Sequence, residues 1–247
     1  MVIFMKAVYL TSSPTGPLDG SRRVEGLDTE NSFAENLRKD WKPDSDVLMI
    51  AASPDDFSQN DEMTSFFRNA FEISGFSVRR FDILDRRSSE QFAAASYDVI
   101  ILGGGHVPTQ NRFFEEINLR EKLKAFDGII IGISAGSMNS AGTVYAQPEL
   151  EGESCDPDYR RILRGLGLTD RMILPHFQMV RNNYLDGRRL IEDITFEDSF
   201  GRCFLVLSDG SYLLLRGGRE LVFGDAWKIS DGELEKINGR NQILEIS

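Results

Sequence analysis

Cysteine and histidine are scarce in this sequence, since each occurs only twice among the 247 residues. Cys155 and Cys203 lie far apart and form no CxxC or Cys/His spacing. This spacing excludes a disulfide framework and a zinc site. We therefore expect a reducing, cytoplasmic setting and a site that uses no metal and no other cofactor.

Long apolar runs and an excess of positive charge are also missing. No stretch approaches the roughly 20 apolar residues of a membrane-spanning helix, and the apolar residues 1–6 are too short for a signal peptide and should lead into the first strand. The formal net charge of −11 argues against nucleic acid or an anionic membrane surface as a partner. A small molecule or peptide, bound by a monomer or a homodimer, fits this charge better.

Apolar runs alternate with helix-like patterns in the first half of the chain. This alternation predicts βαβ units and a mostly parallel sheet, hence an α/β fold. The 41% hydrophobic content is enough for a full core. Strands are expected at residues 7–10, 47–51, 77–81, 99–102 and 128–131, and helices at residues 33–37, 63–71 and 113–123.

The last third of the chain has a different pattern. Residues 188–194 predict one more helix, and the short apolar runs that follow predict strands at residues 203–207, 212–215, 220–223, 227–229 and 234–237. Glycine-containing turns such as Asp209-Gly210 and Asp231-Gly232 separate these runs and are typical of hairpins. We expect an antiparallel hairpin extension that completes the sheet, with no separate domain.

A candidate nucleophile follows the apolar run 128–131. The sequence Gly132-Ile133-Ser134-Ala135-Gly136 has the order strand, small-residue turn and serine. A serine on a sharp strand-to-helix turn projects its hydroxyl outward, and flanking glycines relieve the crowding there. The amide of Ala135 would then face a developing oxyanion.

A nucleophilic serine needs a general base, and both histidines are candidates. His106 ends the run Gly103-Gly104-Gly105-His106, and His176 follows the strand-like residues 172–174. Either could reach Ser134. We favour His176 as the base, because it ends a strand-like run at what should be the same edge of the sheet, and we expect His106 to shape the oxyanion loop.

Three glycines directly follow the apolar run 99–102. Consecutive glycines allow backbone amides to approach a ligand closely, as an oxyanion hole requires, although a flexible turn would also account for them. With Ser134 one strand later, we expect Gly104 or Gly105 to supply one oxyanion donor and Ala135 the other.

These three motifs in order resemble the serine peptidase family of peptidase E (aspartyl dipeptidase) and cyanophycinase. The resemblance rests on the triple glycine, on the Ser134 motif and on Pro175-His176-Phe177, and it spans most of the chain. It implies a flavodoxin-like three-layer sandwich related to class I glutamine amidotransferases, with residues 1–247 as one amidotransferase-like serine peptidase domain. It also implies Ser134 as nucleophile and His176 as base.

The resemblance further implies a triad carboxylate between the serine and the histidine. Counting from the serine reaches Glu149, which we favour, followed by Glu151. Glu153, Asp156 and Asp158 lie in the same segment. A solvated acidic loop is the alternative interpretation for each of them.

Substrate preference depends on a basic residue after the histidine. Aspartyl dipeptidases of this family use such a residue to bind an acidic side chain, and Arg181 is our candidate, beside Arg188 and Arg189. An alignment that places Asp186 at this position is also plausible. The predicted function is hydrolysis of small peptides, Asp-X dipeptides among them, through an acyl-enzyme that needs no metal and resists chelators.

Two other functions share some of these features. An α/β-hydrolase esterase also carries G-x-S-x-G, although its histidine usually lies further from the serine than the 42 residues here. A noncatalytic amidotransferase-like binding protein could keep the serine pocket as a ligand site. Activity on short acyl esters, on dipeptides or on neither would separate the three.

Overall fold

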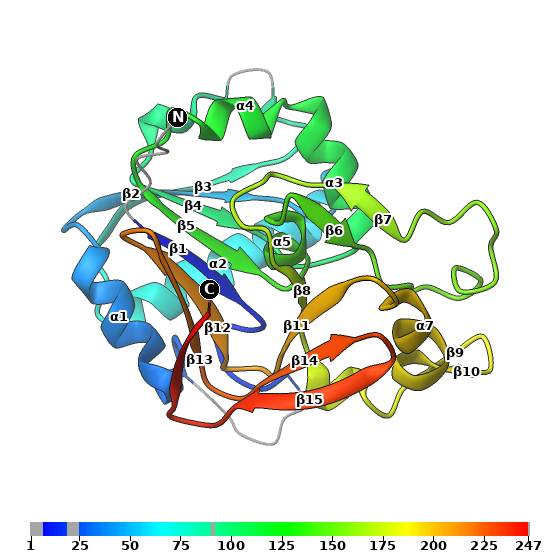
Figure 1. Ribbon diagram of the computed structural model, residues 1–247. Helices are drawn as coiled ribbons and strands as arrows, with labels where there is room; N and C mark the ends of the chain where they lie inside the picture. Colours follow the sequence, from blue (N-terminus) through cyan, green and yellow to red (C-terminus); the bar gives the residue numbers. More distant parts are fainter. Residues whose placement is uncertain (1–6, 19–24, 90–91, 247) are drawn as a thin grey trace.

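An eight-stranded sheet forms the centre of the computed structural model, which describes residues 7–18, 25–89 and 92–246 (Figure 1). The predicted lead-in at residues 1–6 lies outside the described residues. The strand order is β16-β13-β12-β1-β5-β4-β2-β3. Five neighbouring strands are parallel: β1 (Ala7–Thr11), β5 (Ile129–Ile133), β4 (Val99–Leu102), β2 (Ser45–Ile50) and β3 (Val78–Leu84). Three antiparallel strands extend the sheet beyond β1: β12 (Tyr212–Arg216), β13 (Arg219–Phe223) and β16 (Ile243–Ile246).

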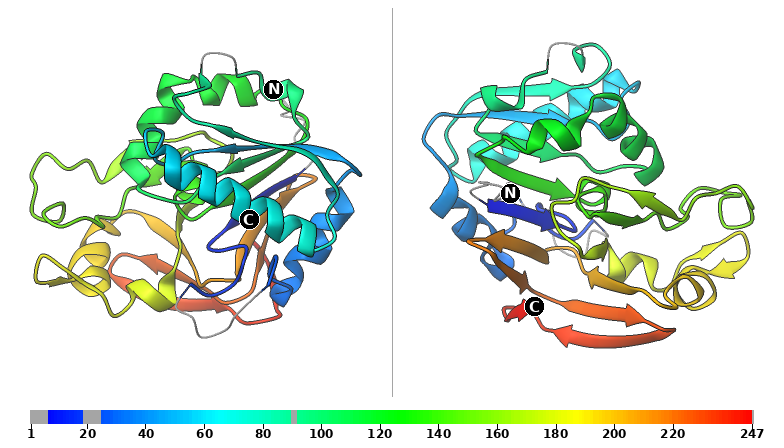
Figure 2. Two further views of the ribbon diagram at one scale, coloured as in Figure 1. Left: turned by 180° about the vertical axis from the view of Figure 1, so that it is seen from behind. Right: turned by 45° about the horizontal axis from the view of Figure 1, so that its top comes forward.

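Helices cover both faces of this sheet, which gives the three-layer sandwich (Figure 2). On β1, Ala7 and Tyr9 pack toward α1 (Phe33–Asp40) and α2 (Phe57–Ile73). Val8 and Leu10 pack on the other face, toward α3 (Val107–Glu116) and α4 (Leu119–Leu123). Because side chains alternate across a strand, a strand buried on both faces must be apolar at every position. The predicted flavodoxin-like arrangement is confirmed.

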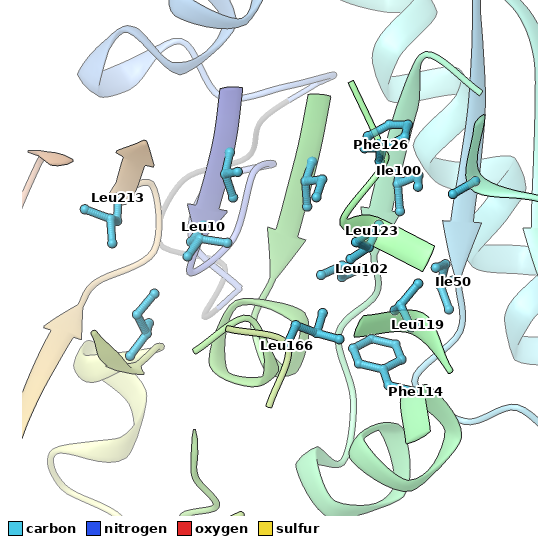
Figure 3. Close-up of a cluster of buried hydrophobic side chains, with 14 of the residues drawn as sticks. Leu10, Ile50, Ile100, Leu102, Phe114, Leu119, Leu123, Phe126, Leu166 and Leu213 are labelled. Atoms are coloured by element: carbon cyan, nitrogen blue, oxygen red, sulfur yellow. The ribbon is translucent and has the colours of Figure 1, made fainter. Parts of the chain in front are cut away.

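The core beneath α3 and α4 is built from aliphatic side chains of the strands (Figure 3). Leu10, Ile100 and Leu102 are completely buried and belong to one cluster with Leu119 and Leu123 of α4. Burying a side chain of this size contributes about 1.5–3 kcal/mol relative to leaving it in water. The parallel strands are therefore held rigidly up to the edge where the candidate site begins.

A second sheet of four strands packs beside the first. Its order is β15-β14-β11-β8, with β8 parallel to β11 and the other pairs antiparallel. Our expectation that all the late strands complete one sheet is thus wrong, because β11 and β12 join different sheets. The turn at Asp209-Gly210 crosses between the sheets and is no hairpin. The strands are β8 (Met172–Leu174), β11 (Cys203–Leu207), β14 (Ala226–Ser230) and β15 (Glu233–Asn238).

Two predicted helices differ from the observed elements. The helix expected at residues 113–123 is divided into α3 and α4 by Asn118, whose φ of 51° lies outside the right-handed helical region. The helix expected at residues 188–194 begins instead as β10 (Arg188–Arg189) and continues as a π-helix, η4 (Leu190–Thr195). In the described part of the chain, no helix is both long and apolar enough to cross a membrane.

The remaining elements are short and lie around the carboxyl edge of the parallel strands or in the connections. They are η1 (Glu30–Ser32), η3 (Ala94–Ser96), α5 (Ala135–Asn139), β6 (Thr143–Tyr145), β7 (Ile162–Arg164), α6 (Phe177–Val180), β9 (Tyr184–Leu185), β10 (Arg188–Arg189), η4 (Leu190–Thr195) and α7 (Phe196–Asp198). β6 pairs with β7, and β9 pairs with β10.

Candidate active site

Ser134 stands on the turn between β5 and α5, in a backbone conformation that L-residues rarely adopt (φ 50°, ψ −112°). Its amide donates to the carbonyl of Thr11, at 3.0 Å, and its own carbonyl accepts from the amides of Ser137 and Met138. Such a conformation costs on the order of 1–3 kcal/mol and persists only where the surroundings enforce it. These bonds hold the serine at the carboxyl end of the sheet, as the sequence predicted.

Gly132 allows the chain to turn back sharply at this point. A Cβ on Gly132 would lie 2.9 Å from both the Cα and the amide nitrogen of Ser137. The first turn of α5 therefore packs directly on the backbone of β5. Any side chain at residue 132 would push α5, and with it Ser134, out of place.

His176 lies in hydrogen-bonding contact with Ser134. The distance from its Nε2 to the Ser134 Oγ is 2.8 Å. The residue follows β8 with a left-handed backbone (φ 57°), and its amide donates to the Ser12 Oγ, at 2.8 Å. Because β8 belongs to the second sheet, the histidine reaches the serine from the neighbouring sheet and not from the same sheet edge, which corrects our expectation.

Asp209 contacts the far side of the same imidazole. Its Oδ1 lies 2.6 Å from the His176 Nδ1, and its side chain is only 1% exposed. The Ser12 hydroxyl donates to this oxygen, while the Leu18 amide and the Gln178 side chain donate to Oδ2. Burial alone would raise the pKa of Asp209, but His176, the Ser12 hydroxyl and the Leu18 amide outweigh it and hold the pKa below its usual value. Asp209 is therefore built to stay ionised beside the histidine.

The structure thus brings Asp209, and not Glu149, to the second imidazole nitrogen. Parallel pairing of β8 with β11 sets Leu174 opposite Val206, so the residues after the two strands meet at one edge. The sequence did contain a signal, since Asp209 lies two residues after the end of the mostly buried strand β11. We interpreted it as a hairpin turn, because an acidic residue was expected before the histidine.

The triple-glycine loop passes beside the serine. A Cβ on Gly104 would lie 3.4 Å from the Ser134 Cβ, and one on Gly105 would lie 2.7 Å from the Ala52 Cβ. Within the described chain, the amides of Gly104, Gly105 and Ala135 donate no hydrogen bond. Three backbone donors are therefore grouped at the nucleophile and remain available to a ligand oxygen.

His106 does not contact Ser134. It instead links the glycine loop to the segment of residues 149–158, which we call the acidic loop. Its Nδ1 lies 2.8 Å from the Thr109 Oγ1, and its Nε2 lies 2.9 Å from Glu153 Oε1. The other oxygen of Glu153 accepts from the amides of Glu149 and Leu150. Glu153 is thus a bridge within the protein, while the remaining acidic candidates of this loop, Glu151, Asp156 and Asp158, are exposed.

The basic candidates do not enter the site. Arg181 stacks over the ring of Phe177, 5.6 Å from its centroid. Arg188 and Arg189 pair with acidic residues nearby, Glu197 and Asp193. Each of these three arginines therefore contacts another side chain of the protein and is not directed into the pocket.

Asp186 joins two loops beside the site. Its carboxylate accepts from the amides of Gly152 and Ser154 and from the Ser154 hydroxyl. It therefore binds the acidic loop to the turn between β9 and β10, and both of its oxygens accept hydrogen bonds from that loop.

A pocket of about 210 Å³ opens at Ser134. Its walls come from the glycine loop, the acidic loop, the end of β8 before His176 and the β9 region. The lining residues include Ser134, His176, Glu149, Tyr184 and Leu185. Among the residues that the structure describes, no group of three histidine, cysteine, aspartate or glutamate side chains is placed to hold a metal ion.

Comparison with known proteins gives one family and several related folds. The model of peptidase family S51 matches residues 50–222. A peptidase from an acI-B1 Actinobacterium has a similar structure, with a TM-score of 0.62 and 15% identity over 99% of this chain and 98% of that one. A peptidase E candidate from Listeria monocytogenes EGD-e gives a TM-score of 0.55 and 14% identity over 95% of this chain and 100% of that one. No curated protein matches the sequence.

Proposed function

The chain belongs to peptidase family S51 and is a serine peptidase, and from that premise we propose that it hydrolyses small peptides with Ser134, His176 and Asp209 as its catalytic triad. One observation carries the proposal: a continuous chain of hydrogen-bonding contacts runs from the Ser134 Oγ through both imidazole nitrogens to the buried Asp209 carboxylate. This is the arrangement by which a histidine removes a proton from serine while a carboxylate fixes its tautomer.

The first half of the reaction forms an acyl-enzyme. The Ser134 Oγ attacks the carbonyl carbon of the scissile amide, and its proton passes to the His176 Nε2. The carbonyl π electrons move to the oxygen, which the amide of Ala135 and an amide of Gly104 or Gly105 stabilise. The C–N bond then breaks, and the amine leaves with the proton that His176 returns.

Water completes the second half. His176 accepts a proton from a water molecule that attacks the acyl carbon, and it then protonates the Ser134 Oγ as the ester bond breaks. Asp209 stays ionised throughout and stabilises the imidazolium that forms twice in each cycle. The products are a carboxylic acid, an amine and the restored serine.

The Asp-X preference implied by the resemblance finds little support in this site. An aspartate side chain would need a cationic partner, and no lysine or arginine is found among the described residues that line the pocket. Arg181, our candidate for this role, lies over Phe177 instead. We therefore propose small peptides as the substrate class and carry no preference for aspartate forward.

A fluorophosphonate probe and a peptide panel test the proposal. We expect the probe to add its mass to the peptide containing Ser134, and Ser134→Ala and His176→Ala to lose hydrolysis of every peptide that the wild type cleaves, by at least about 10³-fold in kcat/KM. His106→Gln serves as the matched histidine control and should retain more activity than His176→Gln. Labelling at another residue, or peptide cleavage that survives Ser134→Ala, would contradict the proposed triad.

Short acyl esters belong in the same panel. An esterase would cleave them and leave the dipeptides intact. A binding protein without catalysis would cleave neither and would leave Ser134 unlabelled.

A further inference from the structure

The pocket at Ser134 has an uneven distribution of charge. Of the described residues that line it, Glu149 alone carries a carboxylate, His176 is the one basic side chain, and none is lysine or arginine. With a volume of about 210 Å³, the pocket has room for one amino-acid side chain. A ligand group that enters it therefore meets one negative charge and the catalytic imidazole.

Glu149 is held in place by its own backbone. Its amide donates to Glu153 Oε2 at 2.9 Å, and the amide of Leu150 donates to the same oxygen at 3.0 Å. The second oxygen of Glu153 is fixed by His106, which follows the triple-glycine loop. The segment that carries Glu149 is thus linked to the glycine loop, and its backbone is fixed beside the pocket.

The surroundings of Glu149 raise the pKa of its carboxyl group, although several neighbours favour the ionised form. The residue is exposed at the pocket rim. Burial nevertheless raises the pKa of its carboxyl group and Glu153 raises it further, while His106, the Val107 amide and His176 lower it. A carboxylate in this state gains stability from any cation placed beside it, because an opposite charge at close range favours the ionised form.

The β9 part of the pocket wall offers a surface suited to the same kind of group. Tyr184, on β9, is 69% exposed and lines the pocket together with Leu185. An exposed aromatic face attracts ammonium and guanidinium groups and also covers the methylene stem of a long side chain. The Asp186 contacts to Gly152 and Ser154 hold this wall against the loop that carries Glu149.

We propose that Glu149 binds a cationic nitrogen of the substrate residue that is acylated on Ser134. The nitrogen is either the free α-ammonium of that residue or the side-chain ammonium or guanidinium of a lysine or arginine. This inference rests on the proposed function, since it takes the pocket beside Ser134 as the acyl site.

Four substrates test the proposal: dipeptides whose first residue is lysine or norleucine, each with a free and with an acetylated amino terminus. Glu149→Gln keeps the size of the side chain and removes its charge. It should lower kcat/KM by about 10- to 100-fold for substrates that carry the recognised cation, the range expected for a hydrogen bond between charged groups, and leave the others nearly unchanged. Glu151→Gln, two residues away, exposed and outside the pocket lining, is the matched control and should behave as wild type.

The substrate pairs also distinguish the two sources of the cation. If acetylation alone removes the effect of Glu149→Gln, Glu149 binds the α-ammonium; if the exchange of lysine for norleucine removes it, Glu149 binds the side chain. Equal effects of Glu149→Gln on all four substrates, or a preference of the wild type for glutamate in the first position, would overturn the proposal.

A binding measurement separates this proposal from the catalytic one. Calorimetry with Lys-Ala, Nle-Ala and acetyl-Nle-Ala on Ser134→Ala protein needs no turnover. It should show tighter binding of the peptides that carry the recognised cation than of those that lack it, and this difference should be lost in the Ser134→Ala/Glu149→Gln protein. Binding without a difference between these two proteins would refute the role of Glu149 whatever the catalytic result. Fluorophosphonate labelling of Ser134 reports on the proposed triad alone.

Discussion

Gly136 in α5 lies directly against the backbone of Leu102, the last residue of β4. A Cβ added to the glycine would stand 2.2 Å from the Leu102 carbonyl oxygen. The turn that carries the nucleophile is therefore packed on the neighbouring strand without space for a single methyl group.

We expect Gly136→Ala to lower the free energy of unfolding by about 1–3 kcal/mol, because the added methyl group forces α5 away from β4. Activity should fall further than the loss of folded protein explains, since the displacement moves Ser134. Urea unfolding and kcat/KM on the same protein measure the two effects. Gly142→Ala is the control, because its nearest neighbour atom would lie 3.7 Å away, and wild-type stability of Gly136→Ala would contradict the observed packing.

Asp209→Asn tests the identity of the triad carboxylate. The asparagine keeps the shape of the side chain but holds the wrong imidazole tautomer and cannot stabilise the imidazolium, so kcat should fall by about 10³- to 10⁴-fold. Steady-state kinetics measures the change on a peptide that has an acetylated amino terminus and no charged side chain. On the same peptide Glu149→Gln should turn over normally, and the reverse pattern would identify Glu149 as the acid.

Asp209 also predicts a dependence of stability on pH. Its pKa is lower in the folded protein than the value of about 3.9 for an unfolded chain, so its ionised form adds stability above about pH 4, and that contribution is lost as the pH falls further. The decrease in the free energy of unfolding between pH 7 and pH 3 should therefore be smaller in Asp209→Asn than in the wild type. Urea titrations at both pH values measure it, and an equal decrease in the two proteins would show that Asp209 gives no such contribution.

Asp186→Ala removes the three hydrogen bonds that join the acidic loop to the β9–β10 turn. We expect KM to rise several-fold with a smaller effect on kcat, because the pocket wall loosens while Ser134 and His176 keep their own supports. Limited proteolysis within residues 150–160 should become faster. Asp158→Ala, an exposed change in the same loop, should alter neither, and a large loss of kcat with unchanged KM in Asp186→Ala would argue against a role in the pocket wall.

The parallel half of the fold could be predicted from the sequence because its signals are local. The runs at residues 99–102 and 129–133 are apolar at nearly every position. Three glycines follow the first run, and the second contains Gly132, which permits the close turn. The same local signals identify Ser134 as the candidate nucleophile. The structure confirms the parallel sheet and brings His176 to the predicted serine.

The carboxylate could not be predicted, because its place depends on a distant pairing. β11 and β12 have similar lengths and apolar content, and no local pattern indicates that β11 pairs with β8 while β12 pairs with β1. Asp209 follows β11 and His176 follows β8. Because these two strands pair, the two residues lie side by side. Similarly, the π-helix after β10 begins from a sequence whose apolar spacing is also typical of an ordinary helix.

The division of the site between two sheets has a consequence for how the protein is made. Ser134 belongs to the parallel sheet, while His176 and Asp209 follow strands of the second sheet. A growing chain that has emerged only as far as β5 carries a serine without a base, and the base has no carboxylate until residue 209 has been synthesised and the two sheets have docked. With the proposed triad, the newly synthesised enzyme stays inert until its fold is almost complete, and the onset of activity during refolding would report the joining of the two sheets.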